Sequence, residues 1–273
     1  MAEQVREWRD LLDRYDAFQS GKWCFRGDRR HEQGFKTSLE RAAIDRWGCE
    51  WSEMPEIEEG LLRRFKREAH LYLTHEPDEG DKIGWFSLMR HHGAPTRLLD
   101  WTYSFFVALY FAIARTEPGE APLLLAMNLD RLRENVEGQE HLRDLLTEDP
   151  NAKREETVNA IIDHSPRRPL VFPINPWKMN RRLVLQQAVF LVPGDITRPF
   201  MENLEAVEAP GDLIEEIRLS PDREFLKGVT RNLLAMNMSS AALFPGLDGF
   251  AQNLAALIPF PEMRAVDTTP GLE

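Results

Sequence analysis

The chain of 273 residues is 42% hydrophobic and 10% aromatic, which excludes a disordered protein. Its 34 Lys and Arg stand against 45 Asp and Glu, and the net charge of −11 argues against a protein that coats nucleic acid through bulk charge. Cys24 and Cys49 suit a reducing compartment, and no apolar run reaches the roughly 18 residues of a membrane-spanning helix. These numbers predict a soluble cytoplasmic protein with no membrane partner.

The spacing of apolar residues predicts the elements of the first half of the chain. We expect helices over 4–18, 56–75, 82–92 and 104–115, and strands over 23–28 and 122–129. Gly93 ends the third of these helices, and Pro95 forces extended chain after it.

In the second half, the acidic residues 130–165 indicate one or two surface helices, and strands are expected over 169–174, 182–193 and 212–220. A helix begins at Ser220-Pro221-Asp222 and ends near Met236, and residues 246–258 form the last helix. Because the order is not a regular βαβ alternation, the expected fold class is α+β, a single domain with small mixed or antiparallel sheets flanked by helices. The expected division is an N-terminal helix within 1–19, one domain over 20–255 and a C-terminal tail over 256–273.

The motif Phe25-Arg26-Gly27-Asp28 ends the first predicted strand. An arginine fork suits a phosphate or diphosphate, and a glycine beside it lets a ligand approach the backbone. The alternative is an ion pair between Arg26 and Asp28 at a surface turn.

The stretch "LMRHHGAPTRLLDWT" over 88–102 crowds polar groups around a Gly-Ala-Pro break. His91 supplies a hydrogen bond near neutral pH, and Trp101 supplies a flat surface for stacking a ring. Thr102, Tyr103 and Ser104 then open a helix whose amides attract phosphate. The alternative is structural, since Arg97 and Asp100 are close enough in sequence to pair with each other.

Two glutamines, Gln186 and Gln187, interrupt the apolar run over 182–193. On a strand their side chains point to opposite faces, so Gln187 would face a cleft, unless this part is a sheet edge in water. The adjacent acids Glu58-Glu59 read as solvated surface. The adjacent His91-His92 and the widely spaced cysteines predict no metal site.

Four stretches together resemble the FRG domain, a family named after its Phe/Tyr-Arg-Gly motif. They are "FRGD" at 25–28, "HHGAPTRLLDWTYSFFVALYFA" at 91–112, "RRLVLQQAVFLVP" at 181–193 and "LFPGLDGFA" at 243–251. The resemblance covers roughly residues 20–255.

The motif order of this family is similar to that of the ADP-ribosyltransferase fold, which implies NAD as substrate and no metal. In that fold an aromatic-Arg-Gly strand holds the NAD diphosphate, a strand-helix unit shapes the nicotinamide pocket, and a later strand carries a catalytic glutamate. The resemblance implies catalytic roles for Arg26, His91, Asp100 and Gln187, and cofactor-binding roles for Phe25, Arg26, Gly27, Arg97, Trp101, Thr102, Tyr103 and Ser104.

Val189 departs from the pattern, because it stands where the related fold has its glutamate. Asp100, Asp195 or Asp248 could supply a carboxylate from elsewhere. The alternatives left open are an ADP-ribosyltransferase acting on a nucleic acid, a protein or water, an NAD glycohydrolase, and a non-catalytic module that senses a nucleotide. The resemblance also implies a bacterial toxin or antiphage defence effector, with a neutralising antitoxin or other partner protein as a further expectation.

Overall fold

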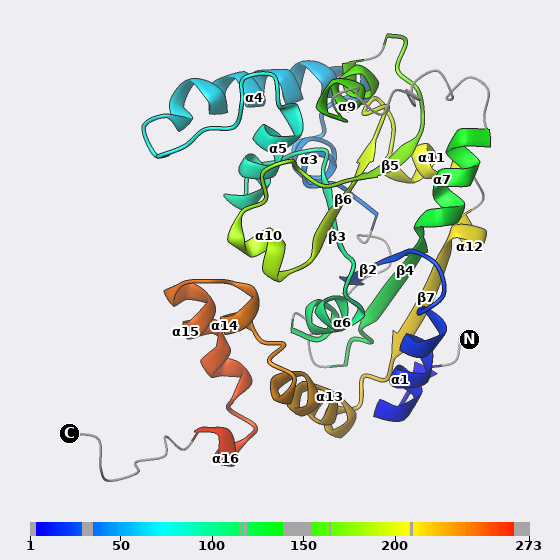
Figure 1. Cartoon of the computed structure of the whole chain (residues 1–273), viewed down its shortest axis with the longest axis vertical. Helices are drawn as coiled ribbons and strands as arrows, with labels where there is room; N and C mark the ends of the chain where they lie inside the picture. The colour runs from blue at the N-terminus through cyan, green and yellow to red at the C-terminus, as the bar shows by residue number, and fades with distance from the viewer. Residues whose placement is uncertain are drawn as a thin grey trace.

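The structure is a computed structural model that describes residues 4–28, 35–114, 116, 119–138, 154–163, 165–207 and 210–264 (Figure 1). Within these residues, seven strands form a single mixed sheet in the order β1-β7-β4-β2-β3-β6-β5. The strands are β1 (Gln4–Val5), β2 (Trp23–Asp28), β3 (Leu99–Thr102), β4 (Leu123–Asn128), β5 (Val171–Ile174), β6 (Ala188–Pro193) and β7 (Ile214–Leu219). The α+β single domain is confirmed, whereas the prediction of several small sheets is wrong, because β2 and β3 join all the strands into one sheet.

The α-helices of the first half are α1 (Trp8–Ala17), α3 (Ser38–Glu40), α4 (Met54–Ala69), α5 (Lys82–His91), α6 (Phe105–Ala114) and α7 (Leu129–Gly138), with a π-helix η1 (Arg41–Arg46) and a 3-10 turn η2 (Trp51–Glu53). Those of the second half are α9 (Arg154–Asp163), α10 (Arg181–Leu185), α11 (Phe200–Glu205), α12 (Pro210–Leu213), α13 (Arg223–Ala235), α14 (Ser240–Leu243), α15 (Leu247–Ala256) and α16 (Pro261–Arg264).

Most of the expected elements are confirmed within two or three residues of their bounds. The helix expected over 56–75 ends early, at Ala69, where the chain leaves the helix in turns. Residues 4–5 pair with β7 as a parallel strand instead of starting the first helix. Residues 181–185 form α10 rather than the start of a strand, because Asn180 caps this turn by accepting a hydrogen bond from the Leu183 amide. Part of the expected C-terminal tail is helical as α16, and its residues 265–273 lie outside the described residues, as do 139–153 of the acidic segment.

The two faces of the sheet carry separate apolar cores. One core joins α1, α6 and α13 to β2, β4 and β7 and contains Phe25, Phe105 and Leu124. The other lies on the opposite face and contains Cys24, Leu125 and residues of β3, β5 and β6. In Figure 1, α1, α6 and α13 gather at the β7-β4 half of the sheet, whereas α4, α5 and α9 gather at the β5-β6 half.

The sheet is narrowest between β2 and β3. Strand β2 pairs with β4 over six residue pairs and β3 pairs with β6 over four, but β2 and β3 share the single pair Phe25–Thr102. Beyond that pair the two strands diverge, and residues of both strands line a cleft that opens between them.

Candidate anion-binding cleft

A cleft of about 490 Å³ opens where β2 and β3 diverge. This volume is within the range of small-molecule sites in proteins. Its lining comes from β2 (Phe25, Arg26, Gly27, Asp28), β3 (Asp100, Trp101, Thr102), α5 and the turn after it (Ser87, Arg90, His91, Gly93), α10 and β6 (Arg182, Leu183, Gln186, Ala188, Phe190), together with Arg41 and Phe111. Four arginines therefore face two aspartates in a protein whose net charge is −11.

Arg26 lies at the centre of this lining and is largely buried. Its Nη1 donates to the Asp100 carbonyl at 2.7 Å, and its Nη2 donates to Asp28 Oδ2 at 3.1 Å. Its Nε is buried and has no hydrogen-bond partner. Burial lowers the pKa of Arg26, against the raising effect of Asp28 and Asp100. The expected alternative, an Arg26–Asp28 pair, does form, but it lies in the cleft and not at a surface turn.

Arg90 and Asp100 form the second ion pair of the cleft, with Arg90 Nε 2.9 Å from Asp100 Oδ2. Burial raises the pKa of Asp100, but the charge and hydrogen bonds of Arg90 outweigh it, so the pKa of this carboxyl is lowered. The expected pairing of Asp100 with Arg97 is therefore wrong. Asp100 does line the cleft, as expected for a site residue.

Arg41 and Arg182 are the other two arginines of the lining. Arg41 donates to the Lys36 carbonyl and has no carboxylate partner among the described residues. Burial, with Arg26 and Arg90 nearby, lowers its pKa. Arg182 lies over the Phe244 ring, 4.6 Å from the centroid. Neither arginine was expected at the site.

The segment before Arg41 is anchored to the rest of the domain by buried polar groups. The Glu40 carboxylate accepts from the Thr37 amide, which closes a capping box, and from the Phe200 amide at 2.6 Å. The Leu39 amide donates to the Thr96 carbonyl at 3.1 Å. These bonds set the position of Arg41, and a π-helix of the kind that follows is common near functional sites.

His91 lines the cleft as expected, and its Nδ1 lies 3.4 Å from Asn180 Nδ2. Burial, the neighbouring His92 and Arg182 all lower the pKa of His91. Its imidazole is therefore neutral near pH 7.

Trp101 and Thr102 also line the cleft, but the expected roles of the residues that follow need correction. Trp101 is 3% exposed and its indole Nε1 has no partner, so most of the ring belongs to the core. Thr102 Oγ1 donates to the Gln186 carbonyl at 2.6 Å and accepts from the Ser104 amide at 3.0 Å. Tyr103 is exposed and donates to Asn175 at 2.9 Å, and neither Tyr103 nor Ser104 is among the lining residues, because the chain turns away into α6.

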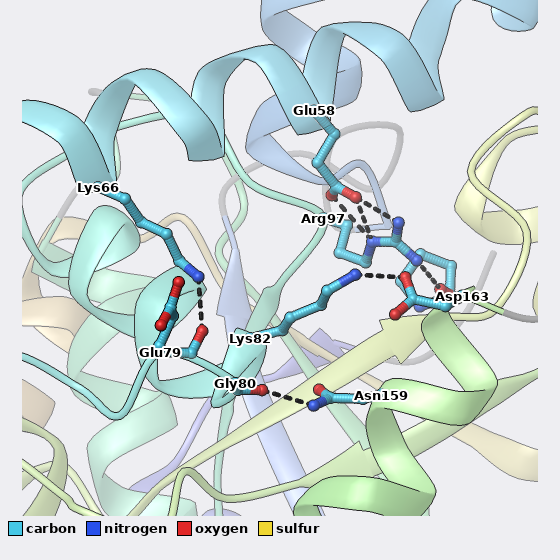
Figure 2. A network of polar contacts seen from close by, with 9 residues as sticks. Glu58, Lys66, Glu79, Gly80, Lys82, Arg97, Asn159 and Asp163 are labelled. Atoms are coloured by element: carbon cyan, nitrogen blue, oxygen red, sulfur yellow. Dashed lines mark hydrogen bonds and ion pairs between the residues drawn. The ribbon is translucent and has the colours of Figure 1, made fainter.

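Arg97 lies outside the cleft, so the placement expected for a diphosphate clamp is wrong. Its side chain is 4% exposed and points to Glu58 on α4, with Nε 2.8 Å and 2.9 Å from the two carboxylate oxygens (Figure 2). Nη1 also donates to the Pro193 carbonyl at 3.4 Å. Glu58 is therefore a buried partner and not the solvated surface acid that its neighbour Glu59 is.

Gly27 has a packing role that the sequence did not reveal. A Cβ on this residue would lie 2.0 Å from the Ala108 carbonyl oxygen and 2.3 Å from the Ala112 nitrogen. The glycine is required because the backbone of α6 lies directly against β2. This packing requires glycine whether or not a ligand binds. Because Gly27 also lines the cleft, the expected approach of a ligand stays a prediction.

The glutamine segment differs most from expectation. Gln187 is exposed, has φ of 45°, and does not line the cleft, because α10 ends just before it. Gln186 takes that place, and its Nε2 donates to the Leu243 carbonyl at 3.1 Å. Val189 is fully buried on β6. The substitutes Asp195 and Asp248 are also outside the lining, so Asp28 and Asp100 are its carboxylates.

The described residues contain no cluster of three His, Cys, Asp or Glu side chains able to hold a metal ion. Their helices include none with the length and apolar character needed to cross a membrane.

Comparison with known proteins assigns one part of the chain. Residues 21–121 match the family model of the FRG domain, which covers β2, Arg41, α5 and β3. No curated protein and no solved structure matches the chain. The matched part holds Arg26, Arg90, His91 and Asp100, whereas Arg182 and Gln186 come from the chain beyond it.

Proposed function

We propose that the cleft binds the diphosphate of NAD and that the protein is an NAD-utilising enzyme of the ADP-ribosyltransferase type. The observation that carries this proposal is the set of four guanidinium groups facing two carboxylates around a cavity of about 490 Å³. Guanidinium forks bind phosphate oxygens with charge-assisted hydrogen bonds. A dinucleotide would supply the two negative charges that this lining lacks.

Unused polar atoms support the fit. Arg26 Nε and Trp101 Nε1 are buried donors without partners, a state that costs free energy unless a ligand or water accepts the bond. Arg41 has no carboxylate partner among the described residues and faces the same cleft. In this proposal Arg26 and Arg41 bind the diphosphate, and Trp101 donates to a ribose or amide oxygen.

The reaction would use the polar groups at the β3 end of the cleft. As the bond between nicotinamide and ribose breaks, positive charge develops on the ribose, and Asp100 is the carboxylate placed to stabilise it. His91, neutral near pH 7, would hydrogen-bond the ribose or the nicotinamide amide. An activity of this type fits the toxin or antiphage effector that the family resemblance implies.

A non-catalytic nucleotide-binding module is the second candidate, and a specific observation favours it. Asp28 and Asp100 are both bound to arginines, and Val189 is buried where the related fold has a glutamate. A carboxylate that is already neutralised gives less stabilisation to a developing positive charge.

The experiment separates binding from turnover. Calorimetric titration with NAD and ADP-ribose is compared for the wild type, Arg26→Ala, and the exposed control Arg63→Ala on α4. Labelled NAD is then followed with nucleic acid, protein extract or buffer alone. Label transfer that Arg26→Ala abolishes supports the transferase, free ADP-ribose alone supports a glycohydrolase, and binding without turnover supports the module. If NAD neither binds nor reacts, the proposal is wrong.

A further inference from the structure

The chain from 164 to 194 has a charge pattern unlike the rest of this acidic protein. It contains no Asp or Glu, and its cations are Arg167, Arg168, Lys178, Arg181 and Arg182. The same stretch supplies one wall of the cleft through α10 and β6. Of these cations, Arg182 lines the cleft, and Lys178 and Arg181 come shortly before it in the sequence.

Within this stretch, residues 175–182 form a segment that is fixed beside the cleft at both ends. At its start, Asn175 donates to the Ala188 carbonyl at 2.6 Å and accepts from the Tyr103 hydroxyl at 2.9 Å. Toward its end, Asn180 caps α10 and contacts His91. Ala188 and His91 both line the cleft, so each end of this segment contacts the lining, and we call residues 175–182 the rim segment.

The rim segment exposes a large aromatic side chain. Trp177 is 76% exposed, although tryptophan is normally well covered in a folded protein. Tyr103, held by Asn175, is 44% exposed. Exposed aromatic rings next to cations are the features that bind unpaired bases, because every base has a face that can stack.

Arg181 and Lys178 differ in their availability to a ligand. Arg181 is exposed and has no carboxylate partner among the described residues. Lys178 pairs with Asp78 at 3.2 Å, so its charge is already partly compensated. The acidic loop that carries Asp78 bounds the surface on that side, which leaves Trp177, Arg181 and the cleft as the favourable path for a polyanion.

We infer that residues 175–182 bind single-stranded nucleic acid, and that this nucleic acid is the acceptor of the ADP-ribosyl group. The inference rests on the proposed function for the transfer step, whereas Trp177 and Arg181 lie outside the cleft lining, so binding to them can be measured without NAD. A base stacks on Trp177, Arg181 binds the adjacent phosphate, and the strand leads a neighbouring nucleotide to the cleft. A duplex is disfavoured because its bases are already stacked on one another.

The transfer step balances without another reactant. The bond between the ribose C1 and the nicotinamide nitrogen breaks, and nicotinamide leaves as a neutral molecule with the electron pair. A nitrogen or oxygen of the acceptor nucleotide forms a new bond to the same C1. The proton displaced from the acceptor is released to solvent, and it carries the positive charge that NAD had on its nicotinamide ring.

The test measures binding of fluorescein-labelled 12-nucleotide RNA and DNA single strands to the whole protein by fluorescence anisotropy, without NAD and at low salt. Trp177→Ala and Arg181→Glu are each expected to weaken binding on the order of ten-fold. Trp47→Ala is the matched control, because Trp47 is 72% exposed and lies beside Arg46, 5.2 Å from that guanidinium. Arg67→Glu, an exposed arginine on α4, controls for the change of charge.

A second arm follows label from NAD into the same oligonucleotides. Loss of both binding and labelling in the rim variants, with unchanged controls, supports the inference. The oligonucleotide that is labelled more strongly shows whether the acceptor is RNA or DNA. Consumption of NAD without oligonucleotide binding overturns the inference and leaves the proposed function standing. Oligonucleotide binding without NAD binding overturns the acceptor role together with the proposed function. A duplex of the same length is measured as well. If the duplex binds as tightly as the single strand, or if the control variants lose as much binding as the rim variants, the inference is wrong.

Discussion

Arg97 and Arg26 both have largely buried side chains, yet their polar partners differ. Arg97 faces both oxygens of Glu58 and also donates to the Pro193 carbonyl, so the charge and the donors are matched within the protein. Arg26 has one carboxylate contact, one carbonyl contact and an unpartnered Nε, and it shares its cleft with three other arginines. Both were expected to clamp one ligand. Complete internal pairing is typical of a structural arginine, whereas the incomplete pairing of Arg26 beside a cavity is the observation from which we propose a binding role.

The largest effect on stability is expected from Glu58→Ala. This variant leaves the buried Arg97 charge uncompensated, which costs about 3–5 kcal/mol in comparable ion pairs. Chemical denaturation measures it, and the exposed neighbour Glu59→Ala is the control, with a change within about 0.5 kcal/mol. A loss of less than about 1 kcal/mol in the free energy of unfolding would contradict a structural role for the pair of Arg97 and Glu58.

Gly27→Ala should destabilise the protein at the motif that carries Arg26. The new Cβ overlaps the α6 backbone, so α6 must move, and the expected loss of stability is about 3 kcal/mol. Gly60→Ala is the matched control, because a Cβ there meets nothing within 4 Å. In the middle of α4 that change should stabilise by about 1 kcal/mol. Equal thermal midpoints for the two variants would contradict the packing role.

Arg41→Ala tests the binding side of the comparison. Loss of a charged hydrogen bond should weaken ADP-ribose binding roughly 10- to 100-fold, with little change in the free energy of unfolding. Removing this cation also relieves its repulsion with Arg26 and Arg90. Arg46→Ala, on the same π-helix but exposed, controls for helix effects in calorimetry. Equal affinity in both variants would place the ligand elsewhere.

The pH dependence of stability should carry a smaller signature of His91. Its pKa in the folded protein is lowered by burial, His92 and Arg182, so below about pH 6.5 the unfolded chain binds more protons at this residue. Stability is therefore lost as the pH falls from about 6.5 through the lowered value. Thermal melts of wild type and His91→Asn from pH 7.5 to 5 should show a shallower decline in the variant. Equal slopes of thermal midpoint against pH in the two proteins would mean that folding does not shift the pKa of His91.

Gln187→Ala should have the smallest effect. The side chain is exposed and outside the cleft, so NAD binding and turnover should stay within two-fold of the wild type, about 0.4 kcal/mol. Gln186→Ala is the contrasting variant, since it lines the cleft and donates to Leu243. If Gln187→Ala strongly reduced NAD turnover and Gln186→Ala did not, the catalytic role that the resemblance implies for Gln187 would be supported.

Local pattern predicted most helices and strands, because apolar spacing reports which face of an element is buried. It also indicated Arg26 and His91, and the family resemblance added Asp100; all three line the cleft. It could not identify Arg41, whose place depends on bonds from Glu40 to Phe200, 160 residues along the chain. The burial of Glu58 and the exposure of Gln187 were also beyond it. The first depends on a partner on another element, and the second on a short helix within a strand-like run.

The single residue pair between β2 and β3 also has a mechanical meaning. Each half of the sheet has its own hydrogen-bonded ladders, whereas among the described residues the two halves pair with each other at Phe25 and Thr102 alone. Arg26 belongs to one half, and Arg182 borders the other. If the proposed function holds, an anion bound by Arg26 and Arg182 would link the two half-sheets and stabilise their arrangement in the bound protein.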